Sequence, residues 1–215
     1  MSIYKSNLGT YGSHAGIVSF ITDHSTVLDV GCSSGYLMDF LIKDRSCTCI
    51  GIEPNLLDYK NASQRGLEVL NSTAENAFKE LSDQGAKFKH IIFGDVLEHM
   101  VFPEVCLKGC VDLLDDDGTI IISLPNIVSL VARVKIVFGI WRYEDEGIFD
   151  STHLRFFNVK SGKKLLEDSG FVIISSIYVG PLTYRFGKRF LMVNRLLPNL
   201  LANQMVFEAK SCRHS

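Results

Sequence analysis

The chain has 215 residues, 47% of them hydrophobic and 21% charged, and its formal net charge is -2. This composition is typical of a globular domain with a substantial buried core, and it excludes an intrinsically disordered chain. The near balance of charges gives no broad cationic field, so we expect no nucleic-acid partner.

Apolar runs bounded by turn residues predict seven strands. In chain order they span residues 26–30, 47–52, 67–70, 89–93, 119–124, 171–178 and 204–210. Helical patterns occupy residues 35–43, 56–65, 74–84, 103–114, 127–138 and 161–169. Strands that alternate with helices favour right-handed crossovers and a doubly wound α/β sheet.

Local signals set several of the predicted boundaries. Pro103 suits the first turn of a helix, and residues 115–118 (Asp-Asp-Asp-Gly) read as a turn before the fifth strand. Asn126 and Ser161 are the predicted N-caps of the two helices that follow.

We expect a single domain spanning residues 1–215. Residues 1–25 would form an N-terminal lid segment. Two stretches, 139–158 and 180–203, break the alternation of strands and helices. Long inserts of this kind usually form lids or substrate walls, so we expect them beside the substrate.

Cysteine usage and the N-terminus predict the compartment. None of the six cysteines has the C-x-x-C spacing of a zinc site, so we expect reduced thiols that pack as small apolar residues. Residues 1–11 lack the apolar core of a signal peptide, and no apolar run reaches the roughly 18 residues that span a bilayer. These features favour a soluble, cytoplasmic protein.

The stretch 27–37 predicts a ligand-binding loop between a strand and a helix. Gly31 and Gly35 allow a sharp turn and a close approach of the backbone to a ligand, and the helix N-terminus favours an anionic group. Glu53 ends the next strand about 22 positions after Gly31, near the spacing of a ribose-binding acid. The spacing of the two glycines is not G-x-G-x-x-G, which disfavours a nicotinamide-dependent oxidoreductase. An ordinary turn and a solvated strand-end acid are the simpler alternatives.

Four motifs together resemble the class I S-adenosylmethionine-dependent methyltransferases over roughly residues 26–171. They are Asp29-x-Gly31-x-Ser33-x-Gly35, Glu53, Asp95-Val96-Leu97-Glu98-His99 and Leu124-Pro125-Asn126. The resemblance implies a Rossmann-like, doubly wound, seven-stranded sheet that is mostly parallel with one antiparallel late strand, with cap or lid insertions. It also implies S-adenosyl-L-methionine as the cofactor.

The same resemblance assigns the cofactor site. Asp29, Gly31 and Gly35 would hold the methionine part, and Glu53 would accept both ribose hydroxyls. The remaining cofactor-binding residues are Cys32, Ser33, Tyr36 and Leu37 of the glycine loop, Pro54 and Asn55 beside the adenine, Thr73, Ala74 and Glu75 in the adenine loop, and Asp95, Val96 and Leu97 on the sulfonium side. Ser33 replaces a usual glycine. Thr73 replaces a frequent aspartate, which leaves the adenine amino contact to Glu75 or to a backbone carbonyl.

Two histidines are candidates for the base that deprotonates a hydroxyl acceptor, because histidine titrates near neutrality. His153 lies in a run that resembles the His-x-Arg-Phe-Phe segment of ubiquinone-pathway and cell-surface glycan O-methyltransferases. We expect His153 to be the general base, Asp150 its orienting partner and His99 the second candidate. The alternatives are that His99 caps a helix or packs in the core, and that His153 and Arg155 pin the insertion to the sheet.

These features predict an O-methyltransferase that acts on a hydroxyl of a saccharide or another small-molecule acceptor. A quinone-like acceptor and a non-catalytic cofactor-binding protein are the alternatives. Asp95, Glu98, His99 and His153 could supply metal ligands, but no helix carries a strong ligand motif, so we expect no metal. Apolar stretches with interspersed cations, at 127–141 and 184–203, are interpreted as the packed core of a cap subdomain. Peripheral membrane contact is the alternative, and a lipid-linked saccharide acceptor would require it. We expect a monomer or a homodimer.

Overall fold

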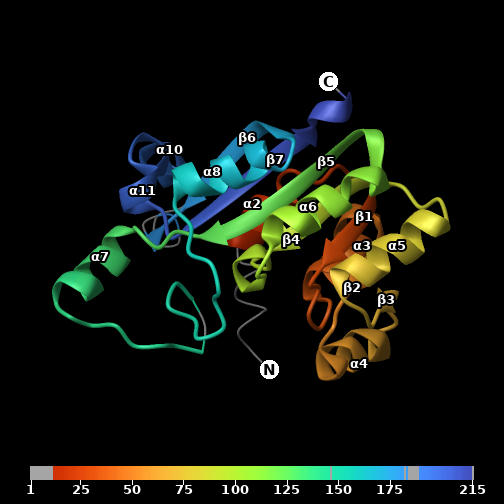
Figure 1. Ribbon diagram of the computed structural model, residues 1–215, viewed down its shortest axis with the longest axis horizontal. Coiled ribbons are helices and arrows are strands. Elements are labelled where there is room, and N and C mark those ends of the chain that lie inside the picture. Colours follow the sequence, from red (N-terminus) through yellow and green to blue (C-terminus); the bar gives the residue numbers. More distant parts are fainter. Residues whose placement is uncertain (1–11, 146, 182, 184–188, 215) are drawn as a thin grey trace.

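The computed structural model describes residues 12–145, 147–181, 183 and 189–214, and the predicted N-terminal lid therefore lies partly outside the described residues. A seven-stranded sheet in the order β3-β2-β1-β4-β5-β7-β6 forms the centre of the molecule (Figure 1). The strands are β1 (Thr26–Val30), β2 (Thr48–Ile52), β3 (Val69–Leu70), β4 (Phe88–Gly94), β5 (Leu114–Pro125), β6 (Phe171–Val179) and β7 (Gln204–Ser211).

The sheet is mostly parallel. Strand β7 runs antiparallel to both of its neighbours, β5 and β6, while the pairs among β1 to β5 are parallel. The prediction of a doubly wound sheet with one antiparallel late strand is confirmed.

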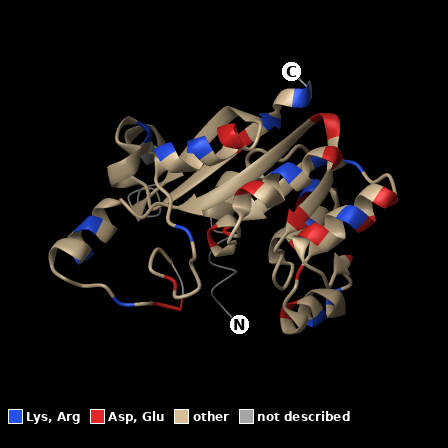
Figure 2. Cartoon of the chain, viewed as in Figure 1, with Lys and Arg blue, Asp and Glu red and all other residues tan. Residues whose placement is uncertain are grey.

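Helices lie along the sheet and at its ends. They are α2 (Ser13–Val18), α3 (Tyr36–Arg45), α4 (Leu56–Gln64), α5 (Ala74–Asp83), α6 (Pro103–Gly109), α7 (Leu130–Val137), α8 (Val159–Asp168), α10 (Arg189–Leu196) and α11 (Pro198–Leu201), with short 3₁₀ turns η1 (Leu97–His99), η2 (Val111–Leu113) and η3 (Cys212–His214). Among these described helices, none combines the length and apolarity needed to cross a bilayer. Lys and Arg residues share several helices with Asp and Glu residues, among them α4, α5, α6 and α8 (Figure 2).

Two apolar clusters cover the two faces of the sheet. Successive residues of a strand point to opposite faces, so Ile91 joins the cluster formed with α5, α6 and α8, whereas Ile92 joins the cluster formed with α2 and α3. Five of the six cysteines are buried, and none of these five forms a disulfide. The two clusters fix the sheet between its helices and hold the carboxyl ends of the strands in place.

The predicted end of α6 and start of β5 are wrong. Helix α6 ends at Gly109 and η2 follows it, so the helix does not reach residue 114. Strand β5 begins at Leu114, and the predicted turn 115–118 is an irregularity inside it, where the pairing passes from Phe88↔Leu114 to His90↔Thr119. Extra residues in one strand are accommodated as a bulge when the pairing resumes beyond them.

Both predicted N-caps are also wrong. Helix α7 is capped by Ser129, whose Oγ accepts a hydrogen bond from the Ala132 amide. Asn126 is instead fully buried and its side-chain amide donates to the carbonyl of Ala202 at 2.8 Å. Helix α8 is capped by Asn158, and Ser161 is the third helical residue of a reciprocal capping box.

The two predicted insertions approach the same end of the sheet. The described parts of 139–158 contain no helix or strand, and Arg155 ties this segment to the loop after β4 by donating to the carbonyl of Val101. Segment 180–203 contains α10 and α11, and the buried Asn194 attaches α10 to β6 by donating to the Tyr178 carbonyl at 3.0 Å. That Arg155 contact matches the alternative in which Arg155 pins the insertion to the rest of the fold.

Candidate active site

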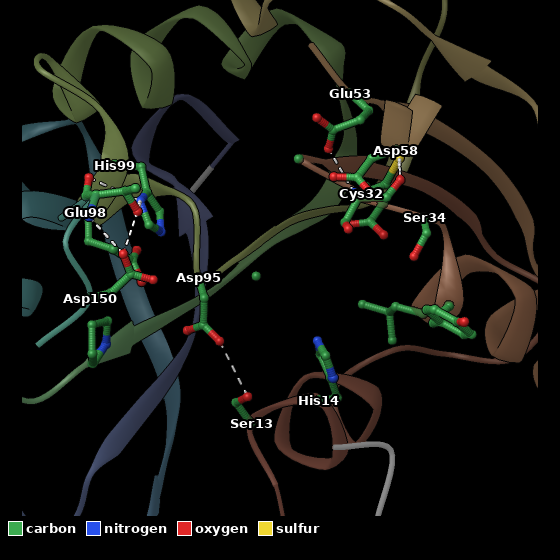
Figure 3. Close-up of a pocket in the computed structure, with 18 of the residues that line it drawn as sticks. Ser13, His14, Cys32, Ser34, Glu53, Asp58, Asp95, Glu98, His99 and Asp150 are labelled. Carbon is green, nitrogen blue, oxygen red and sulfur yellow. Dashed lines mark hydrogen bonds between the residues drawn. The ribbon is translucent and has the colours of Figure 1, made fainter. Parts of the chain in front are cut away.

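A cavity of about 1050 Å³ opens at the carboxyl ends of β1, β2, β4 and β5. It is lined by residues from the glycine loop, from α2, from the loop after β4, from the first insertion and from β7: Ser13, His14, Asp29, Gly31, Cys32, Ser33, Ser34, Tyr36, Leu37, Glu53, Asn55, Asp58, Gly94, Asp95, Glu98, His99, Pro125, Asp145, Gly147, Asp150, Thr152, His153 and Gln204. The carboxyl edge of an open α/β sheet is the usual ligand site. Figure 3 shows Glu53, Cys32, Asp58 and Ser34 on one side of this cavity, Glu98, His99 and Asp150 on the other, and Asp95 between them.

The loop after β1 adopts left-handed backbone angles that bring its main chain close to the cavity. Gly31, Ser33 and Gly35 have φ values of +74°, +49° and +74°. A Cβ on Gly31 would lie 2.6 Å from Cγ2 of Val96, so a side chain there would collide with the loop after β4. The bare backbone at Gly31 thus allows the two loops to approach each other across the site.

Glu53 connects the first two loops of the sheet edge. Its side chain is buried, and its two carboxylate oxygens accept hydrogen bonds from the amides of Ser33 at 2.8 Å and Asn55 at 2.7 Å. Each carboxylate oxygen has a second lone pair, which leaves Glu53 able to accept hydrogen bonds from two hydroxyls of a ligand.

Asp29 lies fully inside the fold at the end of β1. Burial, together with the nearby charge of Glu53, raises the pKa of Asp29 to about 7. The folded chain holds this proton more tightly than the unfolded chain, whose aspartate pKa is about 3.9. Through this group the free energy of unfolding falls as the pH rises from about 4 to about 7.

The family resemblance implies that the cationic amino-acid part of S-adenosylmethionine lies beside Asp29. A cation there would favour the ionised carboxylate, so the affinity for S-adenosylmethionine is expected to rise about tenfold between pH 6 and pH 8. Isothermal calorimetry in buffers of different ionisation enthalpy measures both the affinity and the released proton. Asp29→Asn serves as the control and should remove most of the pH dependence. An unchanged slope in that variant would exclude Asp29 as the titrating group.

Asp95 is fixed by both β5 and α2. It has a φ of +55°, its amide donates to Oγ of Ser123 at 2.9 Å, and Ser123 donates back to the Asp95 carboxylate at 2.6 Å. Ser13 of α2 donates to the other carboxylate oxygen at 3.5 Å. The neighbouring His14 also lines the cavity, and burial lowers its pKa against the opposing charge of Asp95. Sequence reasoning missed Ser13 and His14, because nothing in their local pattern shows that α2 packs beside this loop.

On the far side of Asp95, Thr152 joins Asp150 to His99. The Thr152 amide and hydroxyl both donate to Oδ1 of Asp150, at 2.7 Å and 2.6 Å. Nδ1 of His99 lies 2.9 Å from the Thr152 hydroxyl and 3.2 Å from its carbonyl oxygen. Burial raises the pKa of Asp150, but the two hydrogen bonds from Thr152, together with the nearby His153 and His99, lower the pKa overall.

His153 is the neighbour of Glu98. Their side chains are 5% and 1% exposed, and Nε2 of His153 lies 4.0 Å from the Glu98 carboxylate. Burial raises the pKa of Glu98 well above its ordinary value and lowers that of His153. Asp150 was predicted to orient His153, but its Oδ1 instead binds Thr152.

Glu98, His99 and His153 also offer one donor atom each within 4.8 Å of one another, which is compact enough for a divalent cation to bridge. That no metal is needed therefore stays a prediction.

Some predicted cofactor residues do not line the cavity. Gly35 is instead the N-cap of α3, and Leu97 and Ala74 are buried in the apolar core. Four other predicted residues also do not line the cavity: Pro54, Thr73, Glu75 and Val96. Asn71, which sequence reasoning missed, holds the loop after β2 by donating to the carbonyls of Glu53 at 2.8 Å and Pro54 at 3.2 Å. The loop after β3 thus supports the site through an amide that no motif singles out.

Comparisons with known proteins agree with this geometry. Residues 15–176 match the family described as "Methyltransferase domain". Curated relatives include a ubiquinone biosynthesis O-methyltransferase from Xylella fastidiosa, 32% identical over 117 residues that cover 53% of this chain and 46% of that protein. Another is the mitochondrial ubiquinone biosynthesis O-methyltransferase of Bos taurus, 26% identical over 122 residues that cover 53% of this chain and 32% of that protein. The chain thus spans about half or less of the length of these relatives.

Solved structures share the fold. A SAM-dependent methyltransferase from Archaeoglobus fulgidus has a TM-score of 0.66 at 19% identity, covering 98% of this chain and all of that one. A Burkholderia thailandensis 1,6-didemethyltoxoflavin-N1-methyltransferase has a TM-score of 0.63 at 14% identity, covering 98% of this chain and 81% of that one.

The fold and the site together are those of a Rossmann-like protein that binds a nucleoside-containing cofactor. The chain belongs to the class I S-adenosylmethionine-dependent methyltransferases. The cavity fits that cofactor, since it combines a close-approach glycine at Gly31 with a buried acid, Glu53, that has free lone pairs. S-adenosyl-L-methionine is the cofactor of this family.

Proposed function

We propose that this chain transfers a methyl group from S-adenosylmethionine to a hydroxyl group of a small molecule. The observation that carries the proposal is that the glycine loop and Glu53 share one cavity with two imidazoles, His99 and His153. A hydroxyl must lose its proton as it attacks, and a histidine in the same cavity is suited to accept it.

Cofactor binding is assigned to residues on the side of the cavity next to β1 and β2. Asp29, Gly31 and Glu53 would face the amino-acid and ribose parts, with Asn55 beside the adenine. When bound, S-adenosylmethionine supplies an electrophilic methyl group, since the electron pair of its carbon–sulfur bond goes to sulfur as the acceptor oxygen bonds to the methyl carbon. Asp95 separates this side from the histidines and would border the reacting groups (Figure 3).

We favour an aromatic, quinone-like acceptor. The curated relatives are ubiquinone biosynthesis O-methyltransferases. In the first insertion, the ring of Phe156 lies 6.4 Å from that of His153 and 6.3 Å from that of Trp141, and both aromatic side chains are partly exposed. Aromatic rings favour such edge-to-face contacts. A sugar hydroxyl is the second candidate, supported by the polar lining of Asp145, Asp150 and Gln204.

The test is methyl transfer from radiolabelled S-adenosylmethionine to matched acceptors. We expect labelled product with a catechol or quinol and a weaker or absent product with simple sugars. Labelled sugar alone would reverse the choice of acceptor. If calorimetry shows adenosylhomocysteine binding but no acceptor or lysate fraction is labelled, the chain is a non-catalytic binder and the proposal is wrong.

The insertions also favour contact with a membrane surface, where a polyprenylated or lipid-linked acceptor would lie. Val137, the last residue of α7, and the following Phe138, which lie next to the first insertion, are 81% and 75% exposed, and Met192 and Leu196 of α10 are 75% and 80% exposed. Exposed apolar side chains near cations bind anionic lipid surfaces. Flotation with anionic vesicles should carry the protein upward, and no flotation at low salt would refute the contact.

A further inference from the structure

Thr152 links two residues of the cavity, His99 and Asp150, and the proposed function assigns it no role. It lies in the first insertion, 53 positions from His99, and yet its side chain and carbonyl both contact Nδ1 of that histidine. Its hydroxyl also contacts the carboxylate of Asp150. The three residues therefore form one continuous hydrogen-bonded chain at the edge of the cavity.

The direction of each hydrogen bond follows from the groups involved. The Thr152 hydroxyl has one proton, and the ionised carboxylate of Asp150 can only accept, so that proton is donated to Oδ1 of Asp150. The Thr152 hydroxyl oxygen can therefore only accept a hydrogen bond from Nδ1 of His99. The Thr152 carbonyl is also an acceptor, so both contacts at Nδ1 of His99 require a proton on that nitrogen.

We propose that Thr152 is a positioning residue that holds His99 as its Nδ1–H tautomer, with Nε2 unprotonated and available to take the proton of the acceptor hydroxyl. This proposal rests on the proposed O-methylation. It makes His99 the catalytic base and assigns Asp150 an indirect role through Thr152. The acceptor proton goes to Nε2 as the oxygen attacks the methyl carbon.

The surroundings of the two histidines support this choice. Nδ1 of His99 is oriented by two oxygens of Thr152, whereas the side chain of His153 is only 5% exposed and lies against Glu98. A base needs a fixed ring and access to its substrate. The positive charge that develops on His99 would also face the Asp150 carboxylate through Thr152, as in other histidines oriented by a carboxylate.

The first experiment reads the tautomer without any turnover. Two-bond ¹H–¹⁵N spectra of the uniformly labelled full chain, recorded at a pH where the imidazoles are neutral, distinguish Nδ1–H from Nε2–H rings. His99→Gln identifies the His99 signals by their loss. We expect a predominantly Nδ1–H ring for His99, and a predominantly Nε2–H ring would overturn the proposal even if the enzyme is active.

The second experiment separates positioning from folding. Thr152→Val keeps the shape of the side chain but removes the hydroxyl, and it is expected to lower kcat by about 10- to 100-fold because the base is no longer held in place. KM and the affinity for adenosylhomocysteine should remain near the wild-type values. Thr152→Ser restores the hydroxyl and should restore kcat. Ser151→Ala, which removes the adjacent hydroxyl that makes no hydrogen bond within the described part of the chain, is the matched control.

Three outcomes would overturn the assignment. They are wild-type kcat in Thr152→Val, failure of Thr152→Ser to recover activity, and a smaller loss in His99→Gln than in His153→Gln, since loss of a general base costs about 10²- to 10⁴-fold. Activity abolished by a chelator and restored by a divalent cation would assign His99 to a metal instead. If no variant and no wild-type protein methylates any acceptor, the proposed function fails, while the tautomer measurement still tests the role of Thr152.

Discussion

Replacing Glu53 by glutamine is expected to lower the affinity for S-adenosylmethionine by about 10²- to 10⁴-fold. Two hydrogen bonds from ribose hydroxyls to a buried carboxylate contribute about 1.5–3 kcal/mol each, and glutamine offers one oxygen and no charge. The amide nitrogen would also face one of the two backbone amides, those of Ser33 and Asn55, that the carboxylate now satisfies. Isothermal calorimetry with S-adenosylmethionine and adenosylhomocysteine measures the loss.

Glu68→Gln is the matched control for this variant. Glu68 is an exposed acid just before β3, outside the cavity lining, and its substitution should leave the affinity unchanged. Thermal unfolding of both variants without ligand distinguishes a lost ligand contact from a disordered loop. Wild-type affinity in Glu53→Gln would show that Glu53 does not hold the ribose.

Replacing Gly180 by alanine is expected to destabilise the fold by about 3 kcal/mol, which lowers the midpoint of thermal unfolding by about 6 to 12 °C in a chain of this size. Gly180 follows β6, where the second insertion leaves the sheet. A Cβ at this position would lie 1.9 Å from the carbonyl oxygen of Leu201 and 3.3 Å from Cα of Ala202. These are backbone atoms at the end of α11, so the clash requires α11 and β6 to separate.

Gly109→Ala is the matched control, because it makes the same glycine-to-alanine substitution at a position where the added methyl group fits. Gly109 is the last residue of α6, and its Cβ would meet only the ring of Phe78, at 3.4 Å. Alanine is the better helix former, so this variant should be neutral or slightly stabilising. Equal stability of Gly180→Ala and the wild type, measured by calorimetry or by urea unfolding, would contradict the packing of α11 against β6.

The order of strands and helices could be predicted because each depends on residues close together in the chain. The apolar run of β1, the glycine turn and the acid that ends β2 are local patterns, and the sheet edge brings such strand ends together by topology alone. The misplaced caps show where local pattern stops being sufficient. Asn126 has the chemistry of an N-cap, but its amide satisfies carbonyls more than 70 positions away.

Local sequence patterns were sufficient to predict the sheet, the cofactor family and the acids and glycines of the first loops, because strand periodicity and turn chemistry act between chain neighbours. Which side chains meet on the acceptor side depends instead on how distant segments pack together. The Thr152 hydroxyl contacts both Asp150 and His99, so Asp150 does not orient His153 as predicted. The contact between Thr152 and His99 spans 53 positions of the chain, and the contact between Ser13 and Asp95 spans 82. Both arise because the insertion and α2 pack against the edge of the sheet. A hydrogen bond forms only when donor and acceptor lie within about 3 Å of each other, and the spacing of residues along the chain does not predict such distances between remote segments.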